Sequence, residues 1–210
     1  MGKLLNGPFG AVTGKIGHLV SYELRGQNIV RKNRTVKVKS SVNQLPGQLR
    51  IRVLNVFLKP LKHFINLGFL FEVVGKTRHQ YNEASSYILN YAMKGEYPDI
   101  SIDFEKVKLS VGTLAPANFP TVIKMNESIV INWDYDDKLE FHWRNDRAMI
   151  ALCFQNTKQP IYFLSGSLRS EKLQIIDLDS ETIIKPCHVY VSFFAEDRKS
   201  VSDSTYMYCS

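Results

Sequence analysis

The chain has 210 residues, of which 44% are hydrophobic and 22% charged, and its formal net charge is +7. This composition excludes an intrinsically disordered chain, a collagen-like fibre and a small cysteine-stapled protein. Residues 1–99 contain 15 Lys and Arg against 5 Asp and Glu, whereas residues 100–210 contain 12 against 15. The basic character therefore belongs to the first half of the chain, where it would attract anions.

The first forty residues predict β-hairpin structure. Two β-rich runs, 18–24 and 28–31, flank Arg25-Gly26-Gln27, which suits a three-residue hairpin loop. Residues 32–40 then alternate basic and β-branched side chains, as in an exposed edge strand that lysines protect from pairing. The same pattern suits an extended arm that binds an anion, so the sequence leaves both alternatives open.

Two helical regions are predicted next. Apolar residues recur at spacings of three and four from Leu49 to Ile65. Pro60 falls inside this period, and it predicts a kink or two short helices that meet at Lys59-Pro60. A further helix is expected over residues 78–93, because Lys94-Gly95 supplies a basic residue and a terminating glycine.

From residue 100 onward the pattern predicts an antiparallel β-sandwich, with short β-rich runs separated by turn clusters. We expect strands near 107–111, 128–133, 147–155, 161–168, 172–178, 188–195 and 204–208. Residues 120–210 resemble a fibronectin type III domain, with Trp133 placed as its early core tryptophan. The predicted fold class is α+β: a basic β-hairpin and helical module over residues 1–99, joined to a fibronectin type III-like sandwich over residues 100–210.

The three cysteines, Cys153, Cys187 and Cys209, are widely spaced and form no C-x-x-C motif. The N-terminus lacks the apolar run of a signal peptide, and no apolar stretch reaches the length of a membrane span. We therefore expect a reduced, cytoplasmic protein that does not enter a membrane. A Cys153–Cys187 bridge between two strands remains an alternative.

No motif for catalysis, a cofactor or a metal is found. Gly14-Lys15 lacks the earlier glycine and the following hydroxyl residue of a phosphate-binding loop. The five histidines have no metal-ligand spacing, and the carboxylates of residues 134–140 lack the pattern of a calcium loop. We expect no enzymatic activity and no cofactor.

Short motifs are distributed along the whole chain. They include Asn6-Gly7-Pro8-Phe9-Gly10 with Gly14-Lys15-Ile16-Gly17, Phe57-Leu58-Lys59-Pro60-Leu61, Tyr97-Pro98-Asp99, Leu109-Ser110-Val111-Gly112-Thr113-Leu114 and Ala195-Glu196-Asp197. Together they resemble an uncharacterised family common in Bacteroidota, a domain of unknown function. The resemblance implies no catalytic residue.

The basic residues of the first half form the candidate anion or partner surface. They are Arg25, Arg31, Lys32, Arg34, Lys37, Lys39, Arg50, Lys59 and Lys62. We expect a non-enzymatic binding or assembly protein that contacts a protein partner or a second copy, because a sandwich without a convergent polar cluster presents surfaces rather than chemistry. The alternative is a sequence-independent nucleic-acid-binding protein, in which these cations contact phosphates and aromatic residues such as Tyr22 stack on bases.

Overall fold

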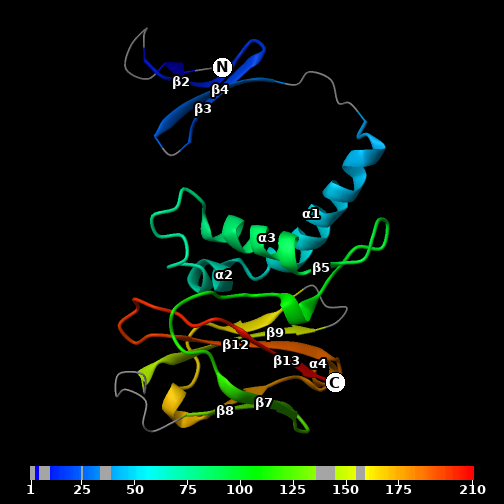
Figure 1. Cartoon of the computed structure of the whole chain (residues 1–210), viewed down its shortest axis with the longest axis vertical. Helices are drawn as coiled ribbons and strands as arrows, with labels where there is room; N and C mark the ends of the chain where they lie inside the picture. Colours follow the sequence, from blue (N-terminus) through cyan, green and yellow to red (C-terminus); the bar gives the residue numbers. More distant parts are fainter. Residues whose placement is uncertain (1–2, 5–9, 25, 34–38, 136–144, 155–158) are drawn as a thin grey trace. The chain divides into compact units, whose positions relative to one another are not determined.

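The computed structural model describes residues 3–4, 10–24, 26–33, 39–135, 145–154 and 159–210. It has the expected α+β class, and its contacts divide the chain into two compact units, residues 1–42 and 43–210 (Figure 1). The sequence predicted a division at residue 99. The contacts divide at Val42 instead, because the helices share one hydrophobic core with strands that follow residue 100.

Residues 1–42 form a four-stranded antiparallel sheet in chain order. The strands are β1 (Lys3–Leu4), β2 (Val12–Ile16), β3 (Leu19–Leu24) and β4 (Gln27–Lys32). The expected hairpin is the β3–β4 pair, although β4 begins at Gln27, one residue earlier than predicted. Gly17 and Gly26 have φ of 53° and 75°, a region that glycine adopts without strain, so they permit the tight turns on either side of β3.

The helical region follows. A short turn, η1 (Val42–Gln44), leads into α1 (Leu45–Leu58), and α2 (Lys62–Gly68) begins four residues after α1 ends. The predicted break at Lys59-Pro60 is confirmed, since Pro60 has no N–H to donate and lies between the two helices. The third helix, α3 (Gln80–Tyr91), begins after His79, whose Nδ1 accepts a hydrogen bond from the Tyr81 N–H at 3.4 Å. No helix of the described residues has both the length and the apolar character to cross a membrane.

Residues 118–209 form two antiparallel sheets. One has the order β11-β8-β7, made of β11 (Leu173–Asp177), β8 (Ser128–Asp134) and β7 (Asn118–Lys124). The other has the order β10-β9-β12-β13, made of β10 (Ile161–Phe163), β9 (Arg147–Phe154), β12 (Cys187–Phe194) and β13 (Thr205–Cys209). Between α3 and β7 lie β5 (Met93–Lys94) and β6 (Ser101–Ile102), which pair with each other, and the short turn η2 (Phe104–Lys106). Two further short elements, η4 (Arg169–Glu171) and α4 (Ser180–Ile183), lie between strands of the two sheets.

Unit 43–210 has three layers: the helices, the β9–β12 sheet and the β8–β7 sheet (Figure 1). The middle sheet is buried on both faces. Ile150 and Leu152 of β9 pack between the sheets, whereas Met149 and Ala151 pack toward the helices beside Phe64. This double burial explains why β9 and β12 are almost continuously apolar, as expected for strands covered on both sides.

Two sequence expectations fail in this unit, and the strand expected over 161–168 already ends at Phe163. Residues 107–111 are not a strand; they run as an extended segment that hydrogen-bonds to residues 203 and 204 through backbone and side-chain groups. Strand β7 was not predicted at all. Pro120 interrupts it, its register with β8 shifts between Asn118 and Thr121, and Phe119 has φ of 41°, so its alternation is broken at the start.

All three cysteines are buried free thiols, so the alternative of a Cys153–Cys187 bridge is not realised. Cys153 packs toward the helices and Cys187 between the sheets, so the two side chains point to opposite faces of one sheet. Cys187 is instead in register with Cys209 of β13. Burial raises the pKa of the Cys187 thiol to about 12, which leaves it protonated and unreactive at neutral pH.

Candidate functional site

The sheet of residues 1–42 presents an apolar face. Cross-strand partners point to the same side of a sheet, which places Ile16, Leu19 and Val30 together through the pairs Ile16–Leu19 and Ser21–Val30. These three side chains, hereafter the apolar face, are exposed by 51%, 49% and 59%. Among the described side chains of this unit only Ser21 is buried.

The opposite side of the same sheet carries charge and an aromatic ring beside the apolar Val20, Leu24 and Ile29. Lys15, Val20 and Arg31 lie in one cross-strand row, and Tyr22 lies in the next row with Ile29. The guanidinium carbon of Arg31 lies 5.8 Å from the centre of the Tyr22 ring, within the range of a cation–π contact. Lys15, Tyr22 and Arg31, hereafter the cationic face, therefore combine two exposed cations with an exposed ring.

The net charge of the chain is confined to this small unit. Residues 1–42 contain eight Lys and Arg against a single acid, Glu23, which gives +7, whereas residues 43–210 contain 19 of each sign. By residue counts alone, the basic character extended over residues 1–99. The division at Val42 narrows it to the four-stranded sheet and the segment that follows it.

The predicted surface residues fall into three groups. Arg25, Arg34 and Lys37 lie outside the described residues. Arg31, Lys32 and Lys39 are exposed in unit 1–42, and Arg50, Lys59 and Lys62 are exposed in unit 43–210. The structure thus places both sets at the surface, each within its own unit. Arg50 already uses part of its hydrogen-bonding capacity within the protein, because its guanidinium donates to the Leu89 carbonyl at 2.6 Å.

Lys15 belongs to the cationic face but was not predicted. It occurs in Gly14-Lys15-Ile16-Gly17, where the glycines indicated turns and drew attention away from a strand. The sequence feature that could have predicted this strand is the short alternation of polar and apolar residues from Thr13 to Ile16. Lys15 and Ile16 accordingly point to opposite faces of β2. Lys32, by contrast, was predicted as part of the candidate surface but does not belong to the cationic face. Its pairing with Leu19 places it on the side of the sheet that carries the apolar face.

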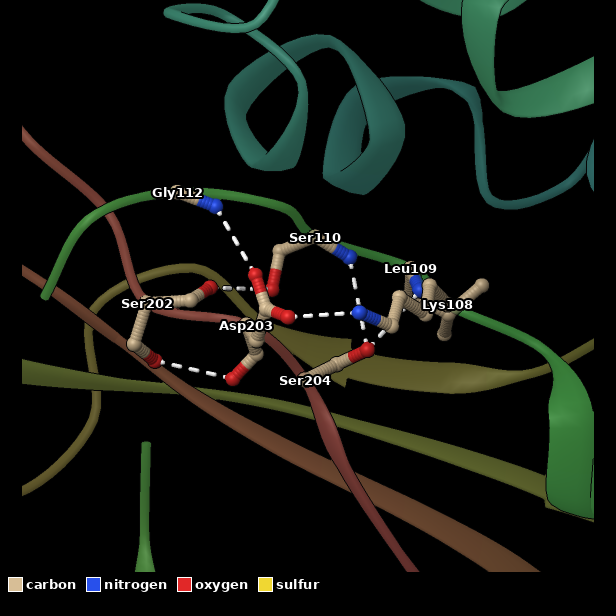
Figure 2. A network of polar contacts seen from close by, with 7 residues as sticks. All are labelled: Lys108, Leu109, Ser110, Gly112, Ser202, Asp203 and Ser204. Carbon is tan, nitrogen blue, oxygen red and sulfur yellow. Dashed lines mark hydrogen bonds and ion pairs between the residues drawn. The ribbon is translucent and has the colours of Figure 1, made fainter. Parts of the chain in front are cut away.

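A network of polar contacts lies in the other unit, where residues 108–112 meet residues 202–204. Figure 2 shows Lys108 paired with Asp203 across 2.6 Å and the Gly112 N–H donating to the second oxygen of that carboxylate at 3.0 Å. The Ser204 hydroxyl accepts from the Leu109 N–H at 2.9 Å. The Ser110 N–H also donates to this hydroxyl, at 3.4 Å, so one carboxylate and one hydroxyl together serve four groups of the neighbouring segment.

The remaining serines of the network also bond the backbone. The Ser110 hydroxyl donates to the Ser202 carbonyl at 2.8 Å, and the Ser202 hydroxyl accepts from the Phe193 N–H at 2.8 Å (Figure 2 shows the first contact). The network therefore fastens the irregular segment 108–112 to residues 202–204 through both backbone and side-chain groups.

Within the described residues, no three His, Cys, Asp or Glu side chains converge as a metal site would require. The predicted carboxylate cluster at residues 134–140 lies mostly outside the described residues; Asp134, its described member, is exposed.

A family model described as "Family of unknown function (DUF6266)" matches residues 11–208. The chain belongs to this family. A search of curated proteins gave no match. Within the DUF6266 match, close packing explains the glycine of the stretch Leu109–Leu114, because a Cβ on Gly112 would lie 2.0 Å from the Val201 carbonyl oxygen. Figure 2 shows the N–H of the same glycine directed at Asp203.

His188 is the buried histidine of the described chain and has an unusual environment. Its ring stacks on Phe104 with centroids 3.9 Å apart, and its Nδ1 lies 2.9 Å from the Tyr206 hydroxyl. Its Nε2 has no hydrogen-bond partner among the described residues. Burial, and then the charge of Lys94, lower the pKa of His188 below the ordinary 6.5. The folded protein therefore holds this imidazole neutral.

Acidification is expected to destabilise the protein through His188. In the unfolded chain the His188 imidazole binds a proton near pH 6.5, whereas in the folded chain it does so only at lower pH, because its pKa is lowered. The free energy of unfolding that is present above pH 6.5 therefore falls as the pH drops from 6.5 toward the pKa of the folded state. One such group changes the free energy of unfolding by at most about 1.4 kcal/mol per pH unit. Urea unfolding between pH 8 and pH 5 should show a shallower pH dependence for His188→Gln than for the native chain. Equal pH slopes in the two proteins would remove His188 as the cause.

Proposed function

We propose that this protein is a non-enzymatic binding or assembly protein whose contact surface is the apolar face of residues 1–42. The observation that carries the proposal is the exposure of Ile16, Leu19 and Val30 on one side of a sheet whose described side chains are otherwise unburied, apart from Ser21. A small sheet gains stability by burying one face against another layer. A partner, either another protein or a second copy of the chain, supplies that layer.

Light scattering and sedimentation of the full chain test the assembly form of this proposal. We expect oligomers that persist at high salt, because the contact is apolar, and a double variant Leu19→Thr with Val30→Thr that associates at least about tenfold more weakly. The matched control, Lys15→Gln with Arg31→Gln, changes the other side of the same sheet and should leave association intact. A chain that stays monomeric at every salt concentration excludes self-assembly.

Nucleic-acid binding without sequence preference is the second candidate function, and the cationic face favours it. Lys15 and Arg31 can neutralise phosphates, and the exposed Tyr22 ring beside Arg31 provides a surface on which a base can stack. Fluorescence anisotropy with a labelled single-stranded oligonucleotide tests it. The Lys15→Gln, Arg31→Gln variant should reduce the slope of log affinity against log salt by about 0.7 for each cation removed.

The two sets of variants control for each other in this experiment. Leu19→Thr with Val30→Thr leaves both cations in place, so we expect it to bind the oligonucleotide as the native chain does. If the native chain fails to bind at low salt, or if both double variants bind equally, nucleic-acid recognition by the cationic face is excluded.

We further infer a fibronectin type III-like arrangement for residues 118–209 and a reducing, cytoplasmic setting. The division of seven strands into β11-β8-β7 and β10-β9-β12-β13 supports the first, together with Trp133, which packs edge-on against Phe193 in the core between the sheets. The three buried free thiols support the second, since disulfides are rare where thiols are kept reduced.

A further inference from the structure

An open hollow of about 670 Å³ lies within unit 43–210, at one end of the β9–β12 sheet. Its apolar wall comes from three places in the chain: Leu67 and Leu70 at the end of α2, Leu164 after β10, and Phe194 at the end of β12. Small-molecule sites are typically concave and apolar with a few placed polar groups, and this volume is within their usual range.

Two arginines are the cations of this hollow. Arg147 begins β9, and its contact with the Gly166 carbonyl is long, at 3.4 Å through one of five N–H donors. Arg198 lies in the turn after β12, where its backbone N–H donates to the Ala195 carbonyl at 3.0 Å. Neither guanidinium is within 4.0 Å of a carboxylate oxygen of the described residues. Both are exposed at the hollow and retain donors for a ligand.

The conformation of Arg198 is a second, independent observation. Its φ is 57°, in the left-handed region that a residue with a Cβ adopts only at a cost and that glycine adopts freely. A turn needs no arginine at this position, and glycine or asparagine would be the less strained choice. Strained residues cluster at functional sites, and here the strained residue is one that lines the hollow.

The hollow also contains one acid. Glu196 accepts a hydrogen bond from the Asn145 side-chain amide at 2.8 Å, so part of its charge is already compensated. Two arginines against one glutamate leave the described lining with a net positive charge. An anionic head group is therefore favoured over a neutral or cationic one.

We propose that this hollow binds a small organic acid in which one carboxylate is joined to an apolar group. The carboxylate is held by Arg147 and Arg198, whose planar guanidinium groups match its geometry. The apolar group packs on Leu67, Leu164 and Phe194. The inference is independent of the contact surface of residues 1–42, because every residue that lines the hollow belongs to unit 43–210.

Calorimetric titration of the full chain with octanoate tests the proposal. We expect saturable one-site binding, with octanamide, which lacks the charge, and acetate, which lacks the apolar group, each binding at least about tenfold more weakly. Arg198→Gly should reduce octanoate affinity by about tenfold or more, without a lower melting temperature, because glycine relieves the left-handed strain.

The matched control is Lys172→Gly. Lys172 is exposed and has the same left-handed conformation, with φ of 62°, but it does not line the hollow. Its replacement relieves similar strain and removes one charge, so octanoate affinity should not change. No octanoate binding to the native chain, binding that Arg198→Gly leaves unaltered, or octanamide binding equal to that of octanoate would each overturn the proposal. Leu19→Thr with Val30→Thr should bind octanoate normally, which separates this site from the sheet of residues 1–42.

Discussion

Replacing Gly112 by alanine is expected to lower the free energy of unfolding by about 3 kcal/mol. An added Cβ would lie 2.0 Å from the Val201 carbonyl oxygen and 2.7 Å from the carbonyl carbon, and backbone atoms cannot move aside as a flexible side chain can. The segment must shift away from residues 201–203. That shift strains the hydrogen bond from the Gly112 N–H to Asp203 and the one from the Leu114 N–H to the Val201 carbonyl.

Urea unfolding measures this loss, and Gly47→Ala is the matched control. Gly47 lies in the first turn of α1, and a Cβ there would meet no atom within 4 Å. Because alanine has the higher helix propensity, Gly47→Ala should raise stability by up to about 1 kcal/mol. The two substitutions are chemically identical, so a similar effect of both would show that the close approach at Gly112 does not hold in solution.

Removing the buried carboxylate of Asp146 is expected to cost about 3–5 kcal/mol. Asp146 and Arg169 are 2% and 3% exposed, and the Arg169 Nε lies 3.7 Å from an Asp146 carboxylate oxygen. The guanidinium also lies 3.9 Å from the centre of the Phe193 ring and donates to the Ala115 carbonyl. Burial lowers the pKa of Arg169 and the charge of Asp146 opposes this effect, so Asp146→Ala removes a carboxylate that compensates the buried guanidinium.

Asp103→Ala is the comparison at the surface. Asp103 and Lys106 form an ion pair at 3.2 Å, but the Lys106 side chain is 68% exposed, so this removal should cost less than about 1 kcal/mol. Chemical unfolding of both variants gives the contrast directly. The double variant Asp146→Ala with Arg169→Met should recover part of the loss, because it removes the buried cation as well. Equal costs for the buried and the exposed pair would contradict the burial argument.

Much of the fold was predictable because local patterns and tertiary packing agree. Pro60 inside an apolar helical period indicated the break between α1 and α2, and turn clusters located most of the sandwich strands. The failures have physical causes. In β7 the shifted register and Phe119 break the alternation, and at residues 107–111 β-branched residues pack without any ladder partner.

The candidate surface was predicted less well than the fold. Charge counting found the basic residues, but it could not find the unit boundary at Val42, which depends on contacts between the helices and strands far along the chain. The pairing Lys15–Val20–Arg31 depends on strand register, and sequence leaves register open when Lys15 appears among turn glycines. The sequence did not indicate Arg198 as a candidate site residue. Its proposed role in the hollow depends on its backbone φ angle and on residues near the ends of α2 and β10 that lie close to it only in the fold.

The separation of charge between the two units has a consequence for solubility. Residues 43–210 are formally neutral at pH 7, so the mutual repulsion that keeps copies dispersed comes from 42 residues alone. An anionic partner that neutralises this unit would leave a complex near its isoelectric point. Titration with such a partner should therefore produce turbidity at charge equivalence and clear again when the partner is in excess.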